Sequence, residues 1–62
     1  MISTETLSKL ADLRAWHVRK LDQHIEMLGK ATTNDCRAAN VAAIDTHSNA
    51  VAALNEVIES LS

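Results

Sequence analysis

Proline, phenylalanine and tyrosine are absent from this 62-residue chain, and Gly29, Cys36 and Trp16 are the only residues of their types. The lack of proline and the single glycine remove the residues that most often interrupt helices. One cysteine excludes an internal disulfide, and one glycine cannot build a glycine-rich phosphate loop. No run approaches the roughly 20 apolar residues that span a bilayer. What remains is an apolar fraction of 47%, mostly Ala, Leu, Val and Ile, which favours a single all-α domain.

Charge is divided unevenly along the chain. The net charge is −2, so no global positive field favours nucleic acid. All the cations lie within residues 1–37, whereas residues 38–62 carry only Asp45, Glu56 and Glu59. The first residues lack the basic and apolar segments of a signal peptide. We therefore expect a cytoplasmic protein that is not inserted in a membrane.

A first helix is predicted over residues of about 4–28. Ser3 is a good N-cap, and Ile2 and Leu7 have the spacing of a hydrophobic staple. A stripe of apolar residues with a spacing of three and four follows, interrupted by Arg14. It comprises Leu7, Leu10, Ala11, Val18, Leu21, Ile25 and Leu28. Gly29 comes directly after it and is predicted to end the helix as a C′ glycine.

A second helix is predicted over residues of about 33–61, after a turn at about 29–32. Thr32 or Thr33 is the expected N-cap, and Asp35 completes a capping-box pattern. Residues spaced alternately by four and three then form a seam typical of coiled coils. They are Cys36, Asn40, Ala43, His47, Ala50, Leu54, Val57 and Leu61. Because the connection is short, residues 1–62 are predicted to form one antiparallel helical hairpin.

The first helix carries more apolar surface than one hairpin can bury. Leu13, Trp16 and Met27 lie away from the stripe that includes Val18 and Ile25. This surplus predicts a dimer or higher oligomer, such as a four-helix bundle made from two hairpins. The residues expected at the interface with another copy or with a partner protein are Leu13, Trp16, His17, Met27, His47, Val51 and Leu54.

Three histidines raise the question of a metal. His17 and His24 are two helical turns apart, about 10 Å, and cannot share one ion. His47 is expected at the same level as His17. Three interpretations of these histidines remain open: they are hydrogen-bonded or solvated residues of the seam, they form a zinc pair completed by Asp45 or a second chain, or they make the seam sensitive to pH. We predict the first of these, and therefore no metal and no cofactor.

Two further polar residues fall on the predicted seam. Cys36 is interpreted as a small seam residue rather than as a reactive thiol at the start of the helix. Asn40 is either buried, where it would fix the helix register, or solvated at the edge of the seam, and Asp22 is expected near its level. A hairpin of this size has no concave pocket of its own. We therefore predict no catalytic residue and no enzymatic activity.

The main alternative to a protein-interaction module is an RNA-binding regulator. Arg14, Arg19 and Lys20 surround Trp16 on the first helix and are its candidate RNA contacts. Acidic residues interleave with these cations at spacings that allow pairing along the helix. The default interpretation of this basic segment is therefore a solvated helix face.

Two resemblances bear on these expectations. In size, plan and the place of its lone Cys36, the chain resembles the Rop family of plasmid copy-number regulators. That resemblance implies a dimeric four-helix bundle that binds RNA loops. The segment from Leu10 to His17 is also similar to small helical proteins of the early regions of lambdoid phages. This second resemblance implies a phage-encoded modulator of host proteins, which would act by binding them.

Overall fold

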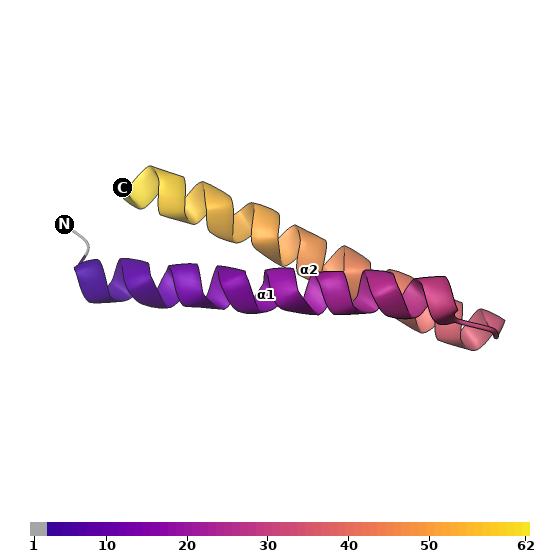
Figure 1. Cartoon of the computed structure of the whole chain (residues 1–62). Helices are drawn as coiled ribbons and strands as arrows, with labels where there is room; N and C mark the ends of the chain where they lie inside the picture. Colours follow the sequence, from indigo (N-terminus) through magenta and orange to yellow (C-terminus); the bar gives the residue numbers. More distant parts are fainter. Residues whose placement is uncertain (1–2) are drawn as a thin grey trace.

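The chain forms two α-helices in the computed structural model, which describes residues 3–62. Helix α1 spans Thr4–Lys30 and helix α2 spans Asn34–Leu61, with three residues between them. The helices pack side by side in opposite directions, and the Cα trace measures 49 × 14 × 11 Å (Figure 1). In Figure 1 the separation between the two ribbons widens from the turn towards the ends of the chain. The predicted all-α antiparallel hairpin is confirmed.

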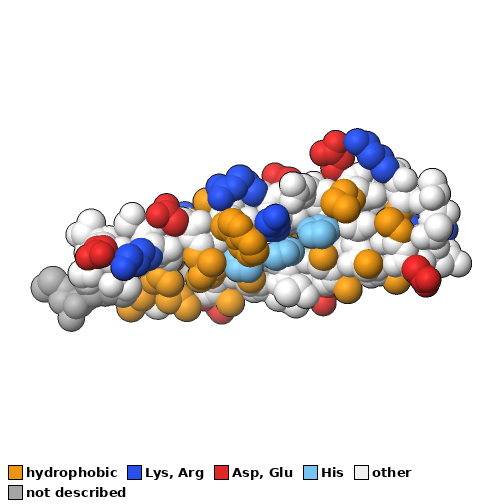
Figure 2. All heavy atoms as spheres, turned by 90° about the horizontal axis from the view of Figure 1, so that it is seen from below, with side chains coloured by type: hydrophobic (Ala, Val, Ile, Leu, Met, Phe, Trp, Pro, Cys, Tyr) orange, Lys and Arg blue, Asp and Glu red, His pale blue; other side chains and the backbone are white. Residues whose placement is uncertain are grey.

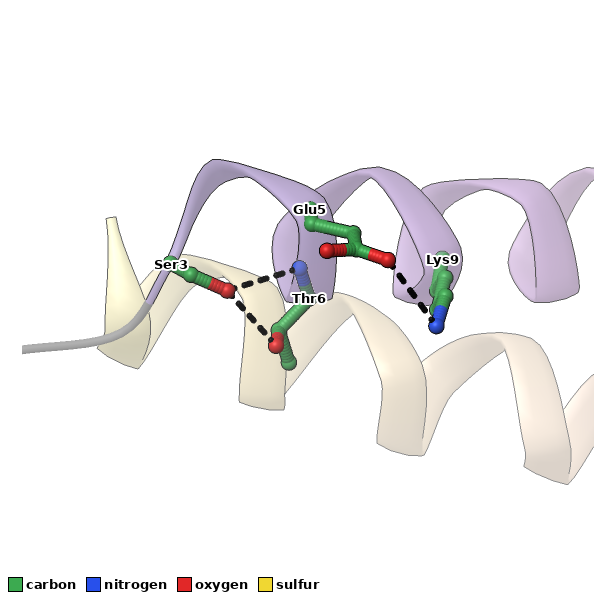
Figure 3. Close-up of polar contacts among 4 residues, drawn as sticks. All are labelled: Ser3, Glu5, Thr6 and Lys9. Atoms are coloured by element: carbon green, nitrogen blue, oxygen red, sulfur yellow. Dashed lines mark hydrogen bonds and ion pairs between the residues drawn. The ribbon is translucent and has the colours of Figure 1, made fainter.

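Side-chain caps begin both helices. The Ser3 hydroxyl accepts a hydrogen bond from the Thr6 N–H at 3.1 Å, and Glu5 pairs with Lys9 one turn later at 3.3 Å (Figure 3). This confirms the predicted cap of the first helix, because Ser3 satisfies a backbone N–H that has no partner within the helix. The other half of the predicted staple, Ile2, lies outside the described residues.

The second helix begins one residue later than the capping-box pattern requires. Thr33 is the N-cap, and its hydroxyl accepts the Cys36 N–H at 3.1 Å. Asp35 is therefore the second residue of the helix. In a capping box the acidic residue is the third, and its side chain reaches back to the backbone N–H of the cap. The prediction of Thr33 as a possible cap is confirmed, and the capping box is wrong.

The end of α1 differs from the prediction. No described glycine has a positive φ, and α1 continues past Gly29 to Lys30. Ala31, in an extended conformation, ends the helix, and its N–H donates to the Leu28 carbonyl at 3.2 Å. An extended C-cap turns the chain without a left-handed residue, so the predicted role of Gly29 is wrong. The Arg37 guanidinium donates to the Ala31 carbonyl at 3.3 Å and holds the turn against α2.

Replacing Gly29 with alanine is expected to stabilise the protein by about 0.5–1 kcal/mol. The residue is helical, and a Cβ built on it would meet nothing within 4 Å. Alanine would therefore lower the backbone entropy of the unfolded chain without a clash in the folded chain. Urea unfolding of Gly29→Ala beside the native chain measures the difference. A loss of stability would show that the turn needs glycine.

The inward face of α1 agrees only in part with the stripe predicted from the sequence, since Leu7, Leu10, Ala11, Leu21 and Leu28 are half-buried. Val18 and Ile25, predicted to be in it, are 40% and 52% exposed. His17 and His24, predicted at the border of the second apolar surface with Leu13, Trp16 and Met27, are half-buried on the inner face instead. The reason is that α1 follows the same alternation of three and four as the seam of α2, since helices that pack along their length keep a period near 3.5. The half-buried residues at these positions of α1 are Leu7, Leu10, Arg14, His17, Leu21, His24 and Leu28.

Burial between the two helices is shallow. Among residues 3–62, Asn40 is the only buried residue, at 4% exposure, and no apolar side chain is buried. The middle of the seam is polar because histidine and asparagine occupy it. The packing of α1 against α2 thus places a polar cluster, rather than an apolar core, at the centre of the hairpin.

Candidate functional site

Two histidines from different helices meet at the middle of the seam. The Nδ1 atoms of His17 on α1 and His47 on α2 lie 2.8 Å apart, and the ring centroids are 5.0 Å apart. At this distance one imidazole donates a hydrogen bond and the other accepts it. Both side chains are half-buried. The sequence-based expectation that the two residues are level with each other is confirmed.

A second polar pair lies closer to the turn. His24 Nδ1 is 2.9 Å from Asn40 Oδ1, and since that oxygen can only accept, the imidazole donates. The Asn40 amide donates in turn to the Cys36 carbonyl at 3.0 Å. The ring of His24 stacks on that of His47, with centroids 5.8 Å apart. We call His17, His24, Asn40 and His47 together the histidine–asparagine layer.

This layer settles the alternatives left open for Asn40 and Cys36. Asn40 is buried on the seam, and its partner across the seam is His24 rather than Asp22, which is exposed. Cys36 was predicted to be a small seam residue, but its free thiol is exposed. Its Sγ lies 3.7 Å from the amide nitrogen of Asn40, so Cys36 lies at the open end of the seam near the turn rather than within it.

The electrostatics of the layer disfavour protonation. Partial burial lowers the pKa of His47 below its ordinary value, and the positive charges of His17, His24 and Lys20 lower it further. His17, His24 and Lys20 are positive in their protonated forms, as His47 is, so each of them disfavours a proton on His47. The hydrogen bond to His17 also requires one ring nitrogen to be unprotonated. Both effects favour the neutral form of the His47 imidazole.

Trp16 covers the layer on one side of the hairpin. Its ring meets His17 and His47 edge-on, with centroids 4.9 and 5.6 Å apart, and the Lys20 ammonium lies 5.5 Å from its centroid. Figure 2 shows this side, where the pale-blue histidines gather at the middle of the molecule beside orange and blue side chains. Of the predicted interface residues, Trp16, His17 and His47 are thus in mutual contact.

The other predicted interface residues divide between the two helices. Leu13 and Met27 are 45% and 48% exposed on α1, whereas Val51 and Leu54 are half-buried on α2. Helix periodicity places Leu13 and Met27 on the same side of α1 as Trp16.

The three candidate RNA-contacting cations do not share a face. Because successive residues turn by about 100° around a helix, Arg14, Arg19 and Lys20 point in three directions roughly evenly spread about α1. Arg14 is half-buried and donates to Asn55 Oδ1 on α2 at 3.1 Å. Sequence reasoning did not identify Asn55 as a seam residue. Its hydrogen-bond partner Arg14 interrupts the predicted apolar stripe, and this interruption was the feature of the sequence that indicated a polar contact at this level of the hairpin.

The described part of the chain offers little for metal or catalytic chemistry. No three His, Cys, Asp or Glu side chains in residues 3–62 are grouped so that they could hold a metal ion. A hollow among the described residues lies on the last turns of α2 and is lined by Glu56, Val57, Glu59 and Ser60, so no histidine lines it. The layer can exchange protons and hydrogen bonds but brings no nucleophile or paired carboxylates together.

Fold and layer together define a two-helix hairpin with a polar, histidine-containing seam. Searches against protein-family models, curated proteins and solved structures find no match to this chain. Neither of the two described helices has a stretch long and apolar enough to cross a membrane.

Proposed function

We propose that this chain is a non-enzymatic protein-interaction module that acts as a homo-oligomer. The observation that carries the proposal is that the hairpin fully buries none of the apolar side chains in residues 3–62. The large ones that remain exposed are Leu13, Trp16, Val18, Ile25, Met27, Val41, Val57 and Leu61. Large exposed apolar surfaces on a small protein mark sites of association.

Energetics support the same proposal. Burial of apolar surface, at about 25 cal/mol per Å², is the main force that offsets the entropy lost on folding. A hairpin without a buried core gains little of it, and the described residues hold no disulfide or metal group in its place. Association with further copies supplies the missing burial, so folding and assembly are expected to be coupled.

The second element of the proposal is a partner protein. An oligomer that buries one face of each hairpin still presents another face, and we propose that a host or partner protein binds there, as a phage-encoded modulator would. We place the module in the cytoplasm, where the exposed Cys36 thiol stays reduced. Because Arg14, Arg19 and Lys20 point in different directions around α1, they do not favour the RNA-binding alternative.

The test of this proposal is sedimentation equilibrium combined with circular dichroism over a wide range of protein concentration. We expect a mass of at least two chains and a melting temperature that rises with concentration, because association stabilises only the folded form. A well-folded monomer whose melting temperature is independent of concentration would contradict the proposal. Binding of total RNA at low salt, lost at high salt, would favour the alternative instead.

A further inference from the structure

The hairpin has two exposed apolar faces of different character. One, the tryptophan face, carries Leu13, Trp16 and Met27 of α1 together with Lys20. The other, which we call the aliphatic face, carries Val18 and Ile25 of α1 and Val41, Ile44 and Val51 of α2. Val18, Ile25 and Val41 are 40%, 52% and 53% exposed, and Ile44 and Val51 are half-buried beside them.

The hydrogen bond between Arg14 and Asn55 shows that these residues share one side of the hairpin. Val18 and Ile25 follow Arg14 by four and eleven residues, and Val51 and Ile44 precede Asn55 by the same intervals. Residues spaced by four and by eleven lie on one side of an α-helix. Val18 and Ile25 thus form a row on α1, and Val51 and Ile44 form a row on α2. Because the helices run in opposite directions, both rows extend from the Arg14–Asn55 contact towards the turn.

We propose that the aliphatic face is the surface on which a second copy of this chain docks. This inference rests on the self-association proposed above and assigns the surface and the partner for it. The face is made of Val and Ile side chains from both helices, and the polar pair at its end, Arg14 and Asn55, is already satisfied within the hairpin. Asp22, the charged residue nearest to Val18 and Ile25, is exposed and is turned towards the outer edge of α1, so a second hairpin can cover the apolar side chains and leave this carboxylate at the rim of the interface.

Symmetry distinguishes this face from the tryptophan face. Two identical chains that dock through the same surface place the residues near the symmetry axis against their own copies. Halfway along α1, the tryptophan face presents Lys20 beside His17 and His47. Docking there would bring two ammonium groups and two sets of imidazoles together. At the same level of α1 the aliphatic face presents Val18, which can pack against its own copy without repulsion.

The dimensions and the charges both suit a second copy. The whole broad side of the hairpin measures 49 × 14 Å for the Cα trace, on the order of the roughly 800 Å² per partner of a stable interface, so a second copy that covers the aliphatic face is expected to lie along the full length of the hairpin. Residues 38–62 carry only acidic charges, whereas every cation lies in residues 1–37. A partner that places its α2 beside α1 of the first copy therefore joins segments of opposite charge. The tryptophan face and the histidine–asparagine layer stay uncovered in this arrangement.

The decisive comparison is between Ile25→Asp and Met27→Asp, studied by sedimentation equilibrium beside the native chain. The two residues are similarly exposed, at 52% and 48%, and lie two positions apart on α1, so the same aspartate has similar effects on the helix itself. We expect Ile25→Asp to weaken association at least about tenfold, equivalent to about 1.4 kcal/mol. Met27→Asp is expected to keep the native mass.

Because Ile25→Asp can also unfold a chain whose folding needs association, a cross-linking measurement accompanies it. In a Cys36→Ser background, Val18→Cys near the symmetry axis is expected to form covalent dimers under mild oxidation, whereas Lys20→Cys is not. Equal or stronger cross-linking of Lys20→Cys, or a dimer that survives Ile25→Asp but not Met27→Asp, would overturn the inference. A native chain that is monomeric at every concentration would instead remove the proposed self-association itself.

Discussion

Acidification from about pH 7.5 to about pH 5 is expected to destabilise the hairpin through His47. In the folded chain the pKa of His47 is lowered by partial burial and by the charges of His17, His24 and Lys20. In the unfolded chain the imidazole regains its ordinary pKa of 6.5. Below that value the unfolded chain binds more protons than the folded chain, so stability is full above it and decreases as the pH falls.

Geometry predicts the same direction independently. The 2.8 Å contact between His17 and His47 is a hydrogen bond only while one ring nitrogen accepts, and protonation of both rings replaces it with repulsion. The rings lie 5.0 Å apart between centroids, close enough for that repulsion to act in a partly solvated seam.

Urea unfolding monitored by circular dichroism at a series of pH values measures this effect. The matched control is His47→Gln, which keeps a hydrogen-bonding side chain and removes the titrating group. We expect its stability to vary much less than that of the native chain between about pH 7.5 and pH 5, a range that stays above the ordinary pKa values of Asp and Glu. An equal decrease in both proteins would place the pH sensitivity elsewhere.

Replacing Asn40 with alanine is expected to lower the free energy of unfolding by about 1–3 kcal/mol. Asn40 is 4% exposed, and its amide joins the Cys36 carbonyl on α2 to His24 on α1. Alanine would leave the His24 N–H without its partner within the seam and open a small gap beside it. The loss is expected in spite of the higher helix propensity of alanine.

Asn49→Ala provides the control, because Asn49 is an exposed asparagine of the same helix. We expect this variant to be as stable as the native chain or slightly more stable, by up to about 0.7 kcal/mol. A double-mutant cycle that combines Asn40→Ala with His24→Ala then isolates the coupling across the seam, for which about 0.5–3 kcal/mol is typical of residues in contact. Equal effects of the two asparagine variants, or a coupling of zero, would show that Asn40 does not join the helices.

A buried asparagine on such a seam also selects the register of the two helices. A shift of α2 along α1 would separate Asn40 from His24 and His47 from His17, leaving polar groups unpaired in the middle of the hairpin. The apolar residues around them, many of them alanine, would tolerate such a shift with little change in buried area. The polar layer thus supplies specificity that shallow apolar packing does not.

Local features of the fold were determined by the sequence alone. Ser3 and Thr33 cap their helices because their hydroxyls accept N–H groups two or three residues ahead, an interaction that needs no tertiary contact. The hairpin follows from two helices and a short connection, and the level of His17 with His47 follows from the length of that connection. The helix-ending role predicted for Gly29 was wrong because Ala31, in an extended conformation, ends α1 without a left-handed glycine.

Tertiary structure alone decided which side of α1 faces α2. Apolar residues flank the seam of α1 on both sides, with Val18 and Ile25 on one and Leu13, Trp16 and Met27 on the other. Because apolar residues lie on both sides of the seam, their pattern in the sequence does not define a unique inner face of α1. The prediction therefore took the more apolar side, with Val18 and Ile25, as the inner one. The structure turns His17 and His24 inwards instead, because His47 and Asn40 on α2 offer them hydrogen bonds that valine and isoleucine cannot make.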